Sequence, residues 1–259
     1  MNQSEYADWL KSNESLRMDA HNTVFKESRR RFHLSRYEFA GRQAAGLRVL
    51  DAACGTGYGS ALLAESAVRV DGVDQCRETI AWATHNYGRS NTCFHAAYVE
   101  FTPFPDSTFD LVVSFETLEH TLSPTTTLWE FVRVMKPGGC GIFSVPNGWG
   151  LTENHFVDFN QSLLERVLGR CFGEFRLYYN NSGTRKNKTA GIAPLEDLPQ
   201  GIAECLVAVC HQPRKADLPA DLRDFWTAEI YQNAFRRHRE YLALRKSIPR
   251  ILRGFLLKD

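Results

Sequence analysis

Short apolar runs alternate with longer segments of helical periodicity through the middle of the chain. Seven runs have the length and apolar character of buried strands, and four amphipathic segments between them predict helices. This alternation is typical of βαβ units, so we expect an α/β fold: a Rossmann-like, seven-stranded, mostly parallel sheet with helices on both faces. The predicted strands are Leu47–Asp51, Val68–Asp74, Thr92–Ala97, Phe109–Phe115, Cys140–Val145, Phe175–Tyr179 and Cys205–His211, and the helices are Gly59–Glu65, Glu78–Asn86, Thr125–Met135 and Gln161–Leu168.

The segments that flank this core have a different pattern. Residues 1–45 predict an amphipathic N-terminal helical cap, residues 46–213 the core domain, and residues 214–259 a basic helical C-terminal extension. Inside the core, Lys136–Gly139 reads as a loop and Asn180–Lys188 as a polar, mobile segment.

Composition narrows the class of protein. Of 259 residues, 43% are hydrophobic and 24% charged, with a net charge of +1, which is ordinary for a soluble globular protein. Seven cysteines without a C-x-x-C pair are expected to be free thiols in a reducing compartment. The N-terminus lacks the pattern of a secretory signal, and no run reaches the roughly 18 apolar residues of a membrane span. We therefore expect a cytoplasmic protein.

The charge is unevenly distributed. From Arg214 onward there are eleven Lys/Arg and six Asp/Glu, which leaves a net −4 on the first 213 residues. The extension can be a helix that docks on the body of the protein or, in a homodimer, on a second subunit. Alternatively, it can be a basic amphipathic segment that lies on the inner face of an anionic membrane. Nucleic-acid binding is disfavoured, because aromatics are few there and no RNA-binding module is visible.

The first predicted strand runs into a small-residue loop that suits a ligand. Asp51 ends the strand and can hold a cationic amino group, while Gly55 and Gly57 let the backbone approach a ligand closely. The spacing is neither that of a P-loop nor that of a dinucleotide-binding loop. The second strand ends at Asp74, whose carboxylate can accept both hydroxyls of a ribose.

An acidic–histidine cluster follows the fourth strand. Glu116, Glu119 and His120 stand at i, i+3 and i+4, so they share one face if they form the first turn of a helix. Two carboxylates and an imidazole suit a divalent cation such as Mg²⁺, with His155 as a fourth ligand. In the metal-free alternative, His120 or His155 is a general base and Glu116 shapes the cleft.

These motifs, together with Pro103–Asp110 and Arg133–Gly139, resemble class I S-adenosylmethionine-dependent methyltransferases, especially ubiquinone-type and bacterial cell-surface-sugar O-methyltransferases. The resemblance covers about residues 45 to 147. It implies S-adenosylmethionine as cofactor, with the glycine loop against its methionine part and Asp74 on its ribose. The candidate cofactor residues are Asp51, Gly55, Thr56, Gly57, Asp74, Gln75, Tyr98, Val99 and Ser114.

One position departs from that family. Relatives carry an aspartate about five residues before the Pro-Phe-Pro turn, and it binds the adenine amino group. This chain has Tyr98 there. Adenine recognition is then expected from stacking on Tyr98, from backbone groups of Val99, or from Glu100.

The resemblance implies O-methylation of a hydroxyl on a sugar, a glycan or a small-molecule acceptor, with the cap and residues 147–160 lining the acceptor pocket. Small-RNA 2′-O-methyltransferases also carry a Glu-x-x-Glu-His metal motif, so metal-dependent methylation of an RNA ribose is an alternative. A further alternative is a non-catalytic partner protein that binds the cofactor without turnover.

Overall fold

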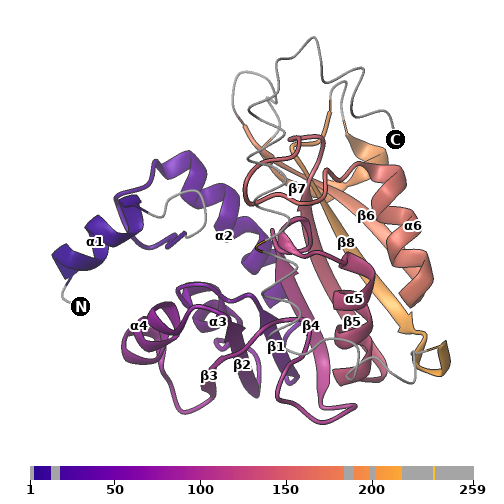
Figure 1. The fold of residues 1–259 in the computed structure, drawn as a ribbon, viewed down its shortest axis with the longest axis horizontal. Coiled ribbons are helices and arrows are strands. Elements are labelled where there is room, and N and C mark those ends of the chain that lie inside the picture. Colours follow the sequence, from indigo (N-terminus) through magenta and orange to yellow (C-terminus); the bar gives the residue numbers. More distant parts are fainter. Residues whose placement is uncertain (1–2, 13–17, 184–189, 199–201, 218–235, 237–259) are drawn as a thin grey trace.

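The computed structural model describes residues 3–12, 18–183, 190–198, 202–217 and 236. Within them the core is one eight-stranded sheet in the order β3-β2-β1-β4-β5-β8-β6-β7 (Figure 1). The first five strands pair in parallel, whereas β8, β6 and β7 are joined by antiparallel pairings. The strands are β1 Arg48–Ala52, β2 Arg69–Asp74, β3 Thr92–Ala96, β4 Phe109–Phe115, β5 Met135–Pro146, β6 Phe172–Ser182, β7 Ala190–Pro194 and β8 Cys205–Pro213.

Helices cover both faces of the sheet, as predicted. Alternate residues of a strand point to opposite faces, so Leu50 packs with the helices α5 and α6 while Val49 packs with the cap and α3. Figure 1 shows these two groups of helices on either side of the strands. The helices are α1 Gln3–Ser12, α2 Glu27–Gly41, α3 Tyr58–Leu63, α4 Arg77–Tyr87, α5 Pro124–Val134 and α6 Gln161–Cys171, with 3₁₀ turns η1 Leu118–His120, η2 Leu195–Asp197 and η3 Lys215–Asp217.

The strand order fixes where a ligand can bind. From β1 the chain adds strands outward to β2 and β3, and then returns to the other side of β1 with β4 and β5. In such a sheet the crevice at the carboxyl ends of the two strands that flank the reversal is open to ligands. These two ends are Ala52 of β1 and Phe115 of β4.

The observed sheet differs from the prediction in its second half. It has eight strands instead of seven, because the edge strand β7 is only five residues long and carries Gly191 and Pro194, two residue types that are depleted in strands. Lys136–Gly139 belongs to β5, where the pairing with β4 shifts register. Strand β6 extends to Ser182, so the predicted mobile segment begins with two buried residues: Asn180 Nδ2 donates to Ser35 Oγ, and Asn181 Oδ1 accepts from the Glu204 amide.

The cap is fastened over the first half of the sheet. The Tyr6 ring of α1 stacks on the Trp82 ring of α4, and the buried Asp19 carboxylate accepts hydrogen bonds from the hydroxyls of Tyr6 and Tyr87. Thr56 Oγ1, in the glycine loop, donates to the Met18 carbonyl at 3.0 Å. Segment 18–26 is thereby held beside the glycine loop.

Most of the predicted C-terminal extension, residues 214–259, lies outside the described residues, which include only 214–217 and Arg236 of it. In the part of the chain that the structure describes, no helix has the length and apolar character that a membrane span requires.

Candidate functional site

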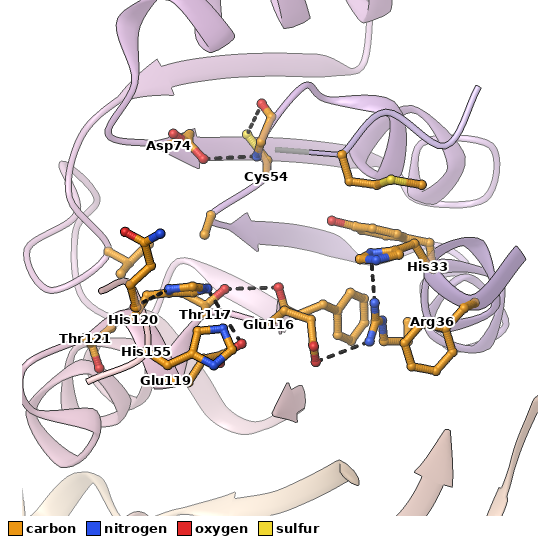
Figure 2. A pocket seen from close by; sticks show the side chains of 18 of the residues that line it. His33, Arg36, Cys54, Asp74, Glu116, Thr117, Glu119, His120, Thr121 and His155 are labelled. Atoms are coloured by element: carbon orange, nitrogen blue, oxygen red, sulfur yellow. Dashed lines mark hydrogen bonds and ion pairs between the residues drawn. The ribbon is translucent and has the colours of Figure 1, made fainter. Parts of the chain in front are cut away.

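A cavity of about 680 Å³ opens at the carboxyl ends of β1 and β4. The glycine loop and Asp74 form one side of it, and the cluster around His120 forms another (Figure 2). Helix α2 of the cap and the segment after β5 complete the wall, as expected from the sequence. The volume and the mixed apolar and polar lining are typical of a small-molecule site.

The glycine loop has the conformation that its sequence predicts. Gly55 and Gly57 have φ angles of +54° and +88°, which favour glycine. A Cβ on Gly55 would meet nothing within 4 Å, and Gly55 lines the cavity. A Cβ on Gly57 would lie 2.6 Å from Ala83 Cβ, so Gly57 packs against α4 instead of the cavity. The two glycines therefore have different roles.

Asp74 links the loop to the second strand. One carboxylate oxygen accepts from the Gly55 amide at 3.1 Å (Figure 2). The other accepts from the Cys76 amide at 2.8 Å. Asp74 and Gln75 both line the cavity. The arrangement holds a carboxylate at the end of β2, where the prediction places the ribose.

The predicted adenine side is assembled after β3. Tyr98, Val99 and Glu100 all line the cavity. Glu100 is a buried residue. The Tyr98 ring lies 5.2 Å from that of Phe101, centroid to centroid. All three candidates for adenine recognition are thus in place.

Four predicted cofactor residues lie behind the cavity wall. Besides Gly57, Thr56 is bonded to the cap, and Ser114 Oγ donates to the Ala52 carbonyl at 2.9 Å. Asp51 is fully buried, and its carboxylate accepts hydrogen bonds from Ser60 Oγ at 2.6 Å and from the Tyr37 hydroxyl at 3.3 Å. Tyr37, but not Asp51, lines the cavity.

The condition under which Glu116, Glu119 and His120 share one face, the first turn of an α-helix, is not met. The segment turns sharply at Glu116, whose φ is +52°, and continues as the short 3₁₀ turn η1. Glu116 is therefore turned away from the other two residues. Its carboxylate lies 3.2 Å from the Arg36 guanidinium of α2 and accepts hydrogen bonds from Ser144 Oγ and Cys205 Sγ.

Glu119, His120 and His155 do come together. One nitrogen or oxygen of each lies within 4.8 Å of the others, and Glu116 is not in this group. His120 Nδ1 is 2.6 Å from the Asn154 carbonyl, so it carries the proton, and Nε2 lies 3.8 Å from Glu119 Oε1. Amides of Phe156 and Val157 donate to the Glu119 carbonyl and hold the segment after β5 against η1.

Burial shapes the charges of this cluster. Glu119 is 1% exposed, and its Oε2 has no hydrogen-bond partner among the described residues. Burial, and then the neighbouring charge of Glu116, raise the pKa of the Glu119 carboxyl well above its ordinary value. Burial also lowers the pKa of His155, whose Nδ1 likewise has no described partner. His155 is therefore neutral near pH 7.

Comparison with known proteins identifies a family for the segment that forms one side of this cavity. Residues 50–143, which include the glycine loop, Asp74 and η1, match the family described as a methyltransferase domain. The domain belongs to the class I S-adenosylmethionine-dependent methyltransferases.

The curated relatives match this methyltransferase domain and little beyond it. A protein of Mycolicibacterium smegmatis named "Probable S-adenosylmethionine-dependent methyltransferase" is 38% identical over 111 residues, 43% of this chain and 42% of the relative. A ubiquinone biosynthesis O-methyltransferase of Aromatoleum aromaticum is 34% identical over 106 residues, 40% and 45% of the two chains. The chain thus spans less than half the length of these relatives.

Solved structures extend the likeness of the fold beyond the matched segment. A SAM-dependent methyltransferase from Thermotoga maritima superposes with a TM-score of 0.58 at 16% identity, over 81% of this chain and 95% of that one. Another from Mesorhizobium loti gives 0.53 at 18% identity, over 70% and 99%. At these identities the likeness supports the methyltransferase fold alone.

Sequence reasoning missed several residues of this methyltransferase cavity. Arg36 and His33 reach it from the cap, Ser182 from the end of β6, and Glu204 from the residue just before β8. The sequence offers one signal for the first pair, since Arg29, His33 and Arg36 are spaced as one face of a helix. Ser182 and Glu204 stand in polar loop-like segments that no local pattern distinguishes.

The two glycines of the methyltransferase loop allow a paired prediction. Gly57→Ala is expected to destabilise the fold by about 3 kcal/mol, since its Cβ would collide with Ala83 in a left-handed backbone. Gly55→Ala is expected to cost about 1 kcal/mol but to weaken S-adenosylhomocysteine binding about tenfold, because its Cβ enters the cavity. Urea unfolding and calorimetry measure both. Equal destabilisation by the two variants would contradict the assignment.

Asp51 allows a prediction about pH. Burial raises the pKa of this carboxyl to about 7, against the lowering effect of the bonds from Ser60 and Tyr37. The folded protein then holds the proton more tightly than the unfolded chain, so the contribution of Asp51 to stability is full below about pH 4 and lost as pH rises to about 7. Asp51→Asn stays neutral throughout.

Between about pH 5 and 8 the free energy of unfolding of Asp51→Asn is therefore expected to gain ~3 kcal/mol on that of the unmodified chain. Urea unfolding across this range provides the measurement. Two parallel stability curves would show that Asp51 is ionised at both ends of the range.

Proposed function

We propose that the chain is an S-adenosylmethionine-dependent O-methyltransferase that acts on a hydroxyl of a sugar, a glycan or a small-molecule acceptor. The observation that carries this proposal is that a single cavity joins the cofactor loop to the Glu119–His120–His155 cluster. The O-methyltransferase relatives support the transfer to oxygen.

The chemistry asks for alignment and for a base. The acceptor oxygen attacks the methyl carbon, the carbon–sulfur bond breaks, and its electron pair stays on sulfur to give S-adenosylhomocysteine. Alignment of the two reactants in one cavity supplies most of the acceleration. His120 Nε2, left unprotonated by the bond from Nδ1 to Asn154, is the group that takes the hydroxyl proton.

As the alternative to a base, the same cluster fits a divalent cation, with His120 Nε2 as a ligand instead of the proton acceptor. Two buried atoms that can bind a metal ion, Glu119 Oε2 and His155 Nδ1, have no hydrogen-bond partner among the described residues. The hydrogen bond from His120 Nδ1 to a backbone carbonyl orients Nε2, as is usual for histidines that bind metals. The set is Glu119, His120 and His155, because Glu116 is held by Arg36. One carboxylate and two imidazoles suit Mn²⁺, Fe²⁺ or Zn²⁺ better than the expected Mg²⁺. A bound cation would lower the pKa of the acceptor hydroxyl.

Calorimetry with chelator-treated protein tests the cation. We expect Mn²⁺ or Zn²⁺ to bind more tightly than Mg²⁺, and Glu119→Gln to weaken binding at least about tenfold. Glu116→Gln is the matched control and should leave the affinity within about threefold. Equal losses in the two variants would restore Glu116 as a ligand, and no binding by any of the three ions would remove the cation.

Product analysis tests the transfer to oxygen. The chain is incubated with methyl-labelled S-adenosylmethionine and a protein-free extract of metabolites and glycans, and the labelled products are resolved by mass spectrometry. Alkali-stable methyl ethers are the expected products. Label confined to amines, carbon or carboxyl esters would overturn O-methylation, while binding of S-adenosylhomocysteine without any labelled product would favour a non-catalytic cofactor-binding protein.

A further inference from the structure

One wall of the cavity adjoins the Glu119–His120–His155 cluster and is built by the segment after β5 together with the end of β6 and the residue just before β8. Among the described residues, these segments contribute Trp149, Asn154, His155, Ser182 and Glu204 to the cavity. Trp149 is the apolar member, and the other four carry hydrogen-bonding groups. A single aromatic face is thus surrounded by polar side chains.

The Trp149 indole is exposed and yet fixed. Its exposed fraction is 54%, and the ring nitrogen donates to the Glu204 carbonyl at 3.0 Å. The ring lies 6.5 Å from that of His155, centroid to centroid, at an interplanar angle of 28°. A large apolar side chain held in this way offers a binding face with little conformational entropy left to lose.

The polar neighbours are fixed as well. The Glu204 carboxylate accepts from Ser182 Oγ at 2.9 Å and from the Ser182 amide at 3.2 Å. The Glu204 amide donates to Asn181 Oδ1, which ties β6 to the residue before β8. A carboxylate and a hydroxyl therefore stand at defined positions in the same wall as the indole.

We infer that this wall is the acceptor subsite and that it binds the pyranose ring of a sugar, an inference that rests on the proposed O-methyltransfer. A pyranose has one face rich in C–H groups and an edge of vicinal hydroxyls, which matches one aromatic face beside Glu204 and Ser182. A planar phenol has two apolar faces, and this wall offers only one. Since Trp149 stacks on His155, a ring seated on the indole has hydroxyls beside the reactive cluster.

Ligand binding in the presence of S-adenosylhomocysteine tests the subsite without requiring turnover. The probes are the methyl glycosides of mannose, glucose, galactose and rhamnose, with catechol as the planar comparison, and the measurements are saturation-transfer NMR and calorimetry. At least one glycoside is expected to bind more tightly than catechol. Trp149→Ala should weaken that glycoside at least about tenfold, and Trp149→Phe should restore part of the loss.

Leu151→Ala is the matched control. Leu151 is an exposed apolar residue of the same segment, 42% exposed, and it does not line the cavity. Its removal should leave glycoside binding unchanged. Binding of catechol alone, of no probe, or of a glycoside with equal affinity in Trp149→Ala would overturn the subsite. Retained binding of S-adenosylhomocysteine and formation of other methyl ethers would show that only the subsite, and not the proposed function, has failed.

Discussion

Replacement of His120 by asparagine is expected to lower kcat about 10³-fold while the affinity for S-adenosylhomocysteine stays unchanged. Asparagine retains a donor close to the position of Nδ1, so it can keep the bond to the Asn154 carbonyl. It lacks the Nε2 atom, which faces Glu119 and the cavity. The variant therefore removes the proposed proton acceptor and keeps the fold of η1.

The assay for this variant separates chemistry from binding. Single-turnover rates of methyl transfer give the loss in the chemical step, and calorimetry gives the cofactor affinity. His85→Asn, a change at a histidine of α4 that does not line the cavity, is the control and should leave both quantities unchanged. A His120→Asn variant that retains the rate of the unmodified chain would show that the base lies elsewhere.

Replacement of Arg36 by methionine is expected to destabilise the fold by about 3–5 kcal/mol. Arg36 is 1% exposed, and its guanidinium lies 3.2 Å from the Glu116 carboxylate and 2.8 Å from His33 Nδ1 (Figure 2). Without the guanidinium, the carboxylate of Glu116, whose side chain is 18% exposed in the cavity wall, loses its ion-pair partner. The loss corresponds to a decrease in Tm of about 10 °C for a chain of this size.

The double variant Arg36→Met with Glu116→Gln distinguishes the ion pair from lost packing. If the stranded charge causes the destabilisation, removal of both charges should recover most of it, and the two changes should not be additive in urea unfolding. Additive losses would show that Arg36 stabilises the cap through packing on Phe32 and not through Glu116.

That the glycine loop and Asp74 lie together at one side of the cavity could be predicted from the sequence, because the determinants are local. A strand that ends in small residues, two glycines and an acid at the end of the next strand are read directly from the order of residues, and the structure places Gly55 and Asp74 together through one hydrogen bond. The alternation of apolar runs likewise predicted seven of the eight strands. The edge strand β7 escaped because its pairing with β6, and not its composition, defines it.

The wall of the cavity around Glu119, His120 and His155 could not be predicted in the same way. Whether Glu116 points toward His120 depends on Arg36, which reaches it from a helix of the cap far away in the sequence. Helical spacing alone brought Glu116, Glu119 and His120 onto one face, and the left-handed backbone at Glu116 removes it from that face. Ser182 and Glu204 join the cavity only through the pairing of β6 with β8.

The most direct test of the central claim compares methyl transfer by the unmodified chain with methyl transfer by Gly55→Ala. Both are measured in one assay with labelled S-adenosylmethionine and a pooled acceptor extract. The account predicts labelled methyl ethers from the unmodified chain, and at low cofactor concentration about tenfold less product from Gly55→Ala. Labelled ethers formed equally by both would place the cofactor outside this cavity. Failure of the unmodified chain to bind the cofactor at all would contradict the account.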